Sequence, residues 1–252
     1  MSDIDYTGYH LVWEDNFTSK KINRNDWNIE LHEPGWVNAE WQEYVDSEEN
    51  ILIKDNKLYL IPKKKKLPDG SFCYTSGRVS TQFKHDFVYG IFEVSAKAPL
   101  GKGFLPAFWL MSTDENIYGQ WPRCGEIDIM EVIGDEPNKL HGTIHYGNPH
   151  EQCQGTYIID GENNFCNSFH TFTCKWEPDS IRWYVDGKLF HETDKWHSTT
   201  EGKGTLPYPA PFDLPFYIIL NLAVGGEWVG YPDETTEFDN PFIIDYVKVY
   251  QK

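Results

Sequence analysis

The sequence predicts an all-β protein with the architecture of a β-sandwich or jelly roll. Short apolar and β-branched runs recur along the 252 residues, and turn residues separate them. Turns spaced by about 8 to 12 residues are typical of sandwiches and jelly rolls, and few stretches have the period of an amphipathic helix. No linker rich in Pro, Gly or Ser and no internal repeat divides the chain, so we expect a single domain over residues 1–252.

Alternating hydrophobicity and the intervening turn residues place the individual strands. The expected strands span residues 10–17, 27–30, 38–44, 51–61 (a hairpin), 77–80, 90–98, 105–111, 124–133, 140–146, 169–176, 181–190 (a hairpin), 216–224 and 242–250. The hairpin turns are expected at 54–56 and at Asp186-Gly187. We interpret Lys63–Lys66 as a solvated loop, because the remainder of the chain is acidic, and residues 193–210 as a long loop.

Net charge and cysteine content exclude several classes of protein. A formal charge of −17 would repel phosphate backbones, so a nucleic-acid partner is not expected. No apolar run reaches the roughly 18 residues of a membrane-spanning helix, and no signal peptide precedes Tyr6. The five cysteines are odd in number and contain no C-x-x-C pair, which excludes a full disulfide framework but leaves one or two bridges open.

Three carboxylates within six residues mark the stretch Cys124–Ile133. In a strand, residues i and i+2 share a face, so Glu126 and Asp128 point the same way while Glu131 points away. A one-residue bulge near Met130 would return Glu131 to the acidic face. Carboxylates buried without partners are costly, so three on one face favour acid/base chemistry or a metal over the alternative of a structural ion-pair row.

The residues around this stretch resemble glycoside hydrolase family 16. Its signature E-x-D-x-x-E is met by Glu126, Asp128 and Glu131, with Trp109 and Trp121 nearby, and the two-residue spacing resembles the laminarinase type. The resemblance extends over nearly the whole chain, from residues 11–17 to residues 245–250. It implies a concanavalin-like jelly roll with a cleft on its concave face.

The resemblance also implies roles for the acids. Glu126 would be the nucleophile of a retaining glycosidase, Glu131 its acid/base, and Asp128 the helper between them. Spacing alone does not distinguish Glu126 from Glu131 in these roles. Asp128, next to two acids, is expected to raise the proton affinity of the group that must begin protonated.

Several side chains are expected to bind sugar. Trp109 and Trp121 flank the acids in sequence and are predicted to stack on apolar sugar faces, with core tryptophans as the alternative. Asn38, Arg78 and His145 are predicted to bind hydroxyl groups. His141 and His145 would form a zinc pair on a helix, but the surrounding residues favour a strand, and the resemblance implies a His near the acid/base.

No cofactor is expected for catalysis, but a structural calcium ion is. Alternation in residues 242–250 places Asp245 on the face of Ile243, Val247 and Val249, with no obvious local base. The resemblance implies a calcium ion on Asp245, with the backbone near Glu14 as a second contributor. The alternative is an Asp bonded to amides or paired with a distant base.

These expectations define an endo-1,3-β-glucanase that also accepts mixed β-1,3/1,4-glucan, with a polysaccharide as its partner. The alternative is a non-catalytic, lectin-like β-glucan-binding module on the same jelly roll, which would need the aromatic residues but not the three acids. The resemblance further implies a secreted protein, and we expect a monomer without membrane or nucleic-acid contacts.

Overall fold

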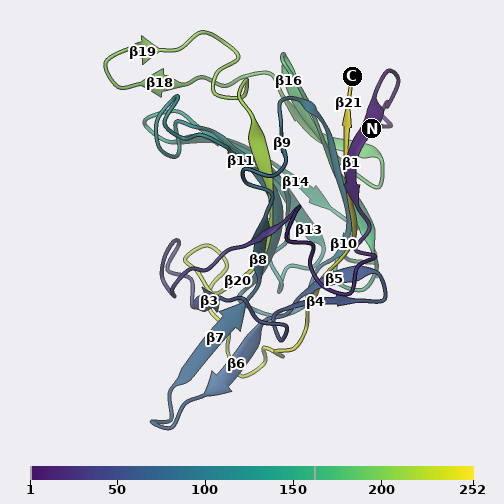
Figure 1. Ribbon diagram of the computed structural model, residues 1–252, viewed down its shortest axis with the longest axis vertical. Coiled ribbons are helices and arrows are strands. Elements are labelled where there is room, and N and C mark those ends of the chain that lie inside the picture. Colours follow the sequence, from purple (N-terminus) through teal and green to yellow (C-terminus); the bar gives the residue numbers. More distant parts are fainter. Residues whose placement is uncertain (1, 162) are drawn as a thin grey trace.

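The computed structural model describes residues 2–161 and 163–252, and within them it contains strands and no helix. Two eight-stranded antiparallel sheets lie against each other (Figure 1). The outer sheet has the order β17-β16-β15-β10-β21-β5-β4, with β1 paired to β21. The inner sheet has the order β14-β13-β12-β11-β20-β8-β2, with β9 paired to β20, and curves away from the outer sheet. The predicted sandwich is confirmed.

The strands of the outer sheet are β1 (His10–Asp15), β4 (Ile51–Lys54), β5 (Lys57–Leu60), β10 (Gly90–Lys97), β15 (His170–Glu177), β16 (Ser180–Val185), β17 (Lys188–Thr193) and β21 (Phe242–Gln251). Those of the inner sheet are β2 (Asn28–Ile29), β8 (Arg78–Ser80), β9 (Asp86–Phe87), β11 (Phe104–Ser112), β12 (Glu126–Glu131), β13 (Lys139–Tyr146), β14 (Glu151–Ile158) and β20 (Phe216–Val224). Two small sheets pair β18 (Thr199–Thr200) with β19 (Gly204–Thr205), and β7 (Phe72–Ser76) with both β3 (Gln42–Tyr44) and β6 (Lys63–Lys66).

Both predicted hairpins form around left-handed turn residues. Asp55 and Asn56 between β4 and β5 have φ of 51° and 54°, and Asp186 and Gly187 between β16 and β17 have φ of 48° and 76°. Two consecutive residues with positive φ match the right-handed twist of the flanking strands. The short strands β18 and β19 lie within residues 193–210, so that segment is not wholly the loop we expected.

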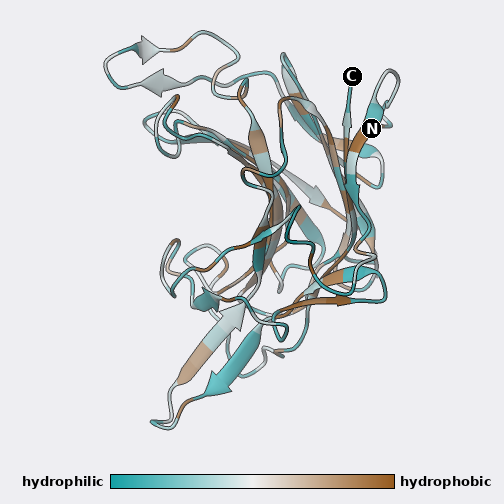
Figure 2. Ribbon diagram, viewed as in Figure 1, coloured by the Kyte–Doolittle hydropathy of each residue, from teal (hydrophilic) through white to brown (hydrophobic). Residues whose placement is uncertain are grey.

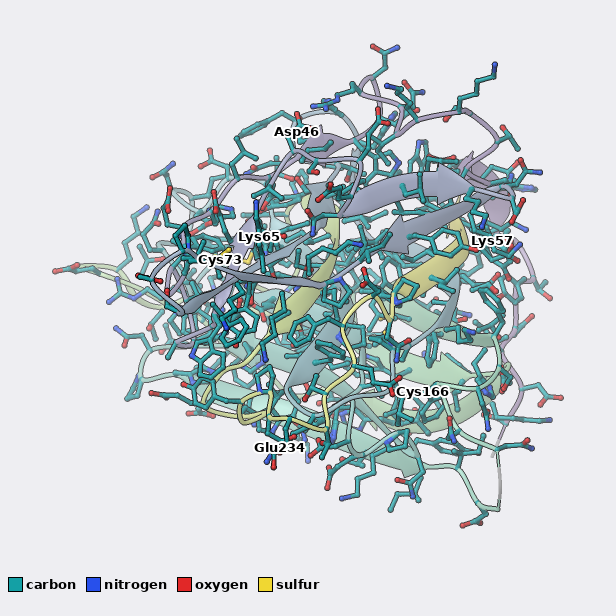
Figure 3. The ribbon with its side chains drawn as sticks, turned by 90° about the horizontal axis from the view of Figure 1, so that it is seen from below. Asp46, Lys57, Lys65, Cys73, Cys166 and Glu234 are labelled. Atoms are coloured by element: carbon teal, nitrogen blue, oxygen red, sulfur yellow. The ribbon has the colours of Figure 1, made fainter. Side chains whose placement is uncertain are left out.

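The lysine run is a strand and not the loop that its charge suggested. Lys63–Lys66 forms β6, the hydrophilic arm of a hairpin that projects from the body of the molecule (Figure 2). Lys65 pairs with Cys73 of β7 (Figure 3), and the ammonium of Lys64 lies 4.4 Å from the ring centroid of Phe72. Pairing with β7 and contact with its aromatic side chain supply the order that four like charges alone would oppose.

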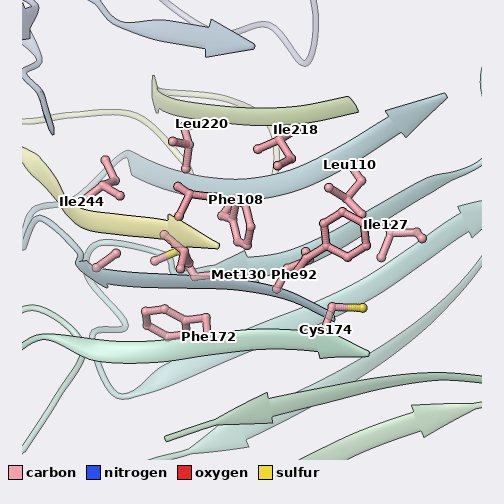
Figure 4. Close-up of a cluster of buried hydrophobic side chains, with 14 of the residues drawn as sticks. Phe92, Phe108, Leu110, Ile127, Met130, Phe172, Cys174, Ile218, Leu220 and Ile244 are labelled. Carbon is pink, nitrogen blue, oxygen red and sulfur yellow. The ribbon is translucent and has the colours of Figure 1, made fainter. Parts of the chain in front are cut away.

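The core fills the space between the two sheets. Alternate residues of β10 are fully buried, and they meet the inward face of β12 (Figure 4). Ile127 and Met130 lie in the same buried cluster as Phe92 and Phe172 of the outer sheet. Burial of these side chains holds the back of β12, so its opposite face is presented on the concave side of the inner sheet.

The cysteines form no disulfide. All five are free, and Cys124 and Cys174 are buried as small apolar side chains. Cys73 and Cys166 lie on separate parts of the chain (Figure 3). The bridges that the sequence left open are therefore absent.

Candidate active site

The bulge predicted in β12 is present. Against β13, Asp128 pairs with Thr143 and Glu131 with His141, so three steps on β12 match two on its neighbour. The register with β11 shifts at the same place. Ile129 and Met130 are both buried, and one of them is the extra residue. As a result Glu126, Asp128 and Glu131 all line one cleft.

A tryptophan of the outer sheet supports this bulge. Trp183 on β16 donates a hydrogen bond of 2.8 Å from Nε1 to the backbone carbonyl oxygen of Asp128. Its ring occupies the space beside Gly142, where a Cβ atom would come within 2.5 Å of the indole. Gly142 on β13 therefore leaves room for the ring to reach the bulge.

The cleft lies on the concave face of the inner sheet and has a volume of about 640 Å³. Besides the three acids, it is lined by four of the residues predicted to bind sugar, namely Asn38, Arg78, Trp109 and Trp121. His145 does not line it but pairs in register with Glu126, next to the acids. The predicted catalytic and sugar-binding residues therefore gather in one region.

The surroundings of Glu126 act on its pKa in both directions. Burial and the negative charge of Asp128 raise this pKa to about 8. The nearby ring of His145 and a hydrogen bond of 2.8 Å from Trp121 Nε1 to Glu126 Oε2 favour the ionised form and oppose that rise. Glu126 thus has groups ready to stabilise a carboxylate.

The surroundings of Glu131, in contrast, act on its pKa in one direction only. Burial, then the negative charges of Asp128 and Glu126, raise its pKa well above its usual value, and all three causes act in the same direction. The proton that Glu126 and Glu131 retain longest is therefore favoured on Glu131. The structure therefore supplies what spacing could not, a physical reason to distinguish a protonated acid from an ionised neighbour.

Asp128 lies between these groups, and its side chain is almost completely buried, at 3% exposure. Its Oδ2 is 3.2 Å from His145 Nε2, an ion-pair distance, although the alignment is not that of a hydrogen bond. The proximity of Asp128 and Glu126 raises the pKa of His145 although burial opposes it. Asp128 therefore interacts electrostatically with His145 as well as with Glu126 and Glu131.

Trp109 and Arg78 are partly committed to contacts within the protein. Trp109 Nε1 donates to Asn221 Oδ1 at 2.7 Å, and the Arg78 guanidinium carbon lies 4.9 Å from the centroid of the indole. Arg78 is buried and forms an ion pair with Glu30. The charge of Arg78 and a hydrogen bond from His32 hold the pKa of Glu30 at about 2 despite burial. Trp109 is therefore half-buried at the floor of the cleft.

Trp121 and a second tryptophan are more open to solvent. Trp121 is 45% exposed and Trp36 is 50% exposed. Trp36, which the sequence analysis did not single out, lines the cleft and stacks on His32 with ring centroids 3.5 Å apart. The signal that could have identified it is a tryptophan directly after the Pro34-Gly35 turn. Exposed, supported rings of this kind suit the apolar face of a sugar.

The polar side chains of the cleft include Asn221, which was not predicted to bind sugar, and Asn38, which was. Asn221 interrupts the apolar run of β20, and its Nδ2 donates to the buried Tyr44 hydroxyl at 3.0 Å. Asn38 lies in a left-handed turn with φ of 53°, and its side chain reaches Glu40 at 3.3 Å. The polar interruption of β20 was the available signal for Asn221.

One group of potential metal ligands occurs among the described residues. Glu126, Asp128 and His145 place one ligand atom each within 4.8 Å of one another. His145 lies at ion-pair distance from Asp128, and its positive charge offsets part of the repulsion between the two carboxylates, so we assign this group to proton chemistry. His141 and His145 share a strand face, as predicted, and His141 Nδ1 contacts Thr156 Oγ1 at 3.0 Å.

The surroundings of Asp245 do not fit the predicted calcium ion. β21 contains an extra residue here, since Ser95 pairs with Tyr246 and Ala96 with Ile244. Asp245 therefore does not share the buried face of Val247, contrary to the prediction. Lys57 Nζ lies 2.8 Å from Asp245 Oδ1 and already supplies a positive charge.

Glu14 does not complete the predicted calcium site either. It pairs in register with Lys248, and β1 ends opposite Val247, before it reaches Asp245. The side chains that are described therefore support the alternative, an aspartate paired with a distant base. The calcium ion stays a prediction without side-chain support.

Comparison with known proteins agrees with this geometry. The sequence model of a family described as "Glycosyl hydrolases family 16" matches residues 34–246. The chain is 35% identical to glucan endo-1,3-β-glucosidase A1 of Niallia circulans, over 100% of this chain but only 39% of that protein. It is 38% identical to a glucan endo-1,3-β-glucosidase of Cryptopygus antarcticus, over 94% of this chain and 90% of that protein.

A solved structure is similar over the whole chain. It is a mutant of a non-specific endo-β-1,3(4)-glucanase with 1,3-β-D-cellobiosyl-glucose at its active site. The TM-score is 0.85 at 34% identity, covering 100% of this chain and 97% of that one. Among the residues described here, none forms a helix long and apolar enough to cross a membrane.

Proposed function

The chain belongs to glycosyl hydrolase family 16, and on that premise we propose that it is an endo-glucanase that cleaves β-1,3-glucan and also mixed β-1,3/1,4-glucan with retention of anomeric configuration. The single observation that carries the proposal is the bulge in β12, which directs the side chains of Glu126, Asp128 and Glu131 toward the same cleft. A retaining glycosidase needs two carboxyl groups, one ionised and one protonated, on either side of the scissile bond.

In the first step, the ionised carboxylate of Glu126 attacks the anomeric carbon while Glu131 donates its proton to the departing glycosidic oxygen. The hydrogen bond from Trp121 and the positive potential of His145 favour the ionised nucleophile. Burial favours the protonated acid at Glu131. The products are a shorter glucan and a covalent glycosyl-enzyme on Glu126.

In the second step, Glu131, now ionised, removes a proton from water as that water attacks the anomeric carbon. The bond to Glu126 breaks, and the sugar leaves with its original configuration. The negative charge of Asp128 favours return of the proton to Glu131, which restores the starting state. Glu126 and Glu131 thus each change charge once in each half-reaction.

The charge and lining of the cleft support a neutral polymer as substrate. The net charge of −17 disfavours sulfated galactans, which usually need basic groove residues. The two-residue spacing between Asp128 and Glu131 favours laminarin-like β-1,3-glucan over xyloglucan. The lectin-like alternative explains the exposed aromatic residues. It does not explain why three acids line one cleft, two of them with a raised pKa, and we therefore prefer the enzyme.

Product analysis on laminarin, lichenan and agarose tests the proposal. We expect oligosaccharides of several lengths from laminarin, a smaller yield from lichenan, and none from agarose. Proton NMR during the first minutes should show β-configured reducing ends before mutarotation. Sugar released only from agarose, or binding to laminarin without any cleavage, would overturn the proposal.

Secretion and a monomeric state are part of the same proposal. A polysaccharide too large to enter a cell must be met outside it, which supports secretion. Fractionation of producing cells tests the location, and light scattering of the purified protein tests the oligomeric state. Retention in the cell, or a stable dimer at micromolar concentration, would contradict these expectations.

A further inference from the structure

Two histidines from neighbouring segments are hydrogen-bonded beside the acids. His145 lies on β13, and His150 ends the short loop that leads into β14. The distance from His145 Nδ1 to His150 Nε2 is 2.9 Å. The centroids of the two rings are 5.1 Å apart, and the ring planes are inclined by only 20°. Trp121 packs against both, with its ring centroid 4.9 Å from that of His150. The pair is thus held in one orientation.

The protons of this pair follow from its partners. His145 Nε2 lies 3.2 Å from Asp128 Oδ2, and the negative charge of this carboxylate favours a hydrogen on that nitrogen although the two atoms are not aligned for a hydrogen bond. Neutral His145 must then accept at Nδ1, and His150 Nε2 donates. When His145 is positively charged, its Nδ1 donates and a neutral His150 accepts. The hydrogen bond persists in both charge states of His145, because in each of them one proton lies between His145 Nδ1 and His150 Nε2.

We propose that His150 is a positioning residue for the reaction: its hydrogen bond turns His145 toward Asp128 and passes to His145 Nδ1 the proton that sets the charge of His145 beside Glu126. As His150 gives up its Nε2 proton it takes a proton from solvent at Nδ1, which is open to it because His150 is exposed, so that His150 stays neutral. The inference rests on the proposed function for its role in hydrolysis, but the hydrogen-bonded pair exists independently of it. No contact between His150 and substrate is involved. His150 acts through His145, and His145 acts on the acids.

The charged groups around the pair favour this division of roles. From β12, Asp128 and Glu126 face His145, and their negative charges raise its pKa although burial opposes the rise. Burial and the positive charge of His145 lower the pKa of His150, so His150 is the neutral member. Across β14, His145 pairs with the uncharged Gln152.

Other titratable groups nearby are already paired with each other. Glu151, at the start of β14, lies 3.7 Å from His197, and Arg123, before β12, lies 3.9 Å from Glu201. The side-chain oxygen of Asn148, in the same loop, accepts hydrogen bonds from Arg123. These pairs leave His150 as the hydrogen-bonding partner of His145 on the side away from Asp128.

The consequence for catalysis concerns the nucleophile. A positively charged His145 stabilises ionised Glu126, which must be deprotonated to attack. Without His150, the Nδ1–H of the charged form would lose its acceptor, and the neutral form would be favoured. Glu126 would then hold its proton to higher pH.

The first test is the pH dependence of kcat/KM with an aryl β-laminaribioside, whose good leaving group needs little help from Glu131. This profile reports the ionisation of the free enzyme. We expect His150→Ala to move the acidic limb upward by roughly half a pH unit or more. His150→Gln should restore part of the shift, because an amide can donate or accept. His197→Ala is the matched control, since His197 is a neighbouring, partly buried histidine that contacts Glu151 and none of Glu126, Asp128 and Glu131.

A double-mutant cycle separates action through His145 from a direct effect. In a His145→Gln background, adding His150→Ala should cause no further shift, because the intermediary is gone. An unmoved acidic limb in His150→Ala would overturn the proposal, as would an equal shift in the His197→Ala control. A shift of full size in the His145→Gln background would also overturn it.

The second test needs no activity and separates this inference from the proposed function. Nitrogen-15 NMR of the histidine rings, without substrate, should show His145 protonated at Nε2 when neutral, and His150→Ala should lower the pKa of His145. Should the protein fail to cleave glucans, this measurement still decides the pairing. Unchanged titration and tautomer of His145 in His150→Ala would refute it.

Discussion

The indole of Trp183 on the outer sheet donates a hydrogen bond of 2.8 Å to the backbone carbonyl of Asp128 on the inner sheet. The bond joins the core directly to the bulge on which the three acids are arranged. A carbonyl at a bulge is released from regular ladder pairing, so it needs another donor when it is buried. The core of this sandwich therefore helps to set the geometry of its cleft.

Replacement of Trp183 should lower both stability and turnover. Trp183→Phe removes the donor from a buried carbonyl, at a cost of about 1–3 kcal/mol, and loosens the bulge. Trp176→Phe is the matched control, because Trp176 is also fully buried and donates at 3.1 Å to the Phe212 carbonyl, not to a carbonyl of β12. We expect both variants to melt earlier but only Trp183→Phe to lose kcat well below its melting temperature. Equal kcat in the two variants would show that the bond has no catalytic role.

Neutral isosteres of the two glutamates should nearly abolish activity without unfolding the protein. Glu126→Gln and Glu131→Gln each remove a group needed in the transition state, so kcat should fall by roughly 10³-fold or more. Azide should rescue the Glu126 variant as an α-glycosyl azide and the Glu131 variant as the β product. Glu192→Gln, in an exposed ion pair with Arg182, serves as control. Near-normal hydrolysis by either glutamate variant would refute the assigned roles.

The same two glutamates should make the protein less stable as pH rises. The pKa of Glu126 is raised from 4.5 to about 8, so between these values the native state binds more protons than the unfolded state. Under that condition the free energy of unfolding decreases with increasing pH. Glu126→Gln should therefore melt higher than wild type at pH 8, by at least roughly 2–4 °C, the equivalent of about 1 kcal/mol. The difference should shrink toward pH 4, and a constant difference across this range would contradict the raised pKa.

The two tryptophans near the acids should respond differently to truncation. Trp121 is 45% exposed, so Trp121→Ala should raise KM for oligosaccharides with little change in melting temperature. Trp109 packs on buried residues and donates to Asn221, so Trp109→Ala should raise KM and also lower the melting temperature. Kinetics and thermal melts on the same samples check both. A large loss of stability in Trp121→Ala would identify it as a core residue.

Chelation distinguishes the ion pair at Asp245 from a calcium site. The ion pair with Lys57 predicts that a chelator leaves the melting temperature unchanged. Asp245→Ala and Lys57→Ala should then each cost little and show a coupling of about 1 kcal/mol or less, because the pair is partly exposed. A melting temperature that falls in chelator for wild type, but not for Asp245→Ala, would instead establish the calcium ion.

Local sequence patterns were sufficient for most strands and for the grouping of three acids in one short stretch. Apolar patterning located β10, β11, β20 and β21 within one or two residues of their observed ends. Alternation marked β10 and β21, whereas nearly continuous apolar runs marked β11 and β20, which are buried on both faces. The spacing of Glu126, Asp128 and Glu131 even required the bulge if all three were to share a face, because residues i and i+5 point to opposite faces of a regular strand. These features depend on residues close together in the chain.

The tertiary structure decided features that depend on residues far apart in the chain. Lys57, 188 positions before Asp245 (245 − 57), becomes its partner only through the pairing of β5 with β21, and the extra residue in β21 follows from pairing with β10. The lysine strand β6 likewise needs β7 beside it. Burial and Coulomb interactions distinguish Glu131 from Glu126, and both depend on three-dimensional distances. The sequence by itself determined which acids share a face, whereas only the folded sheets determined which partners stabilise the charge of each one.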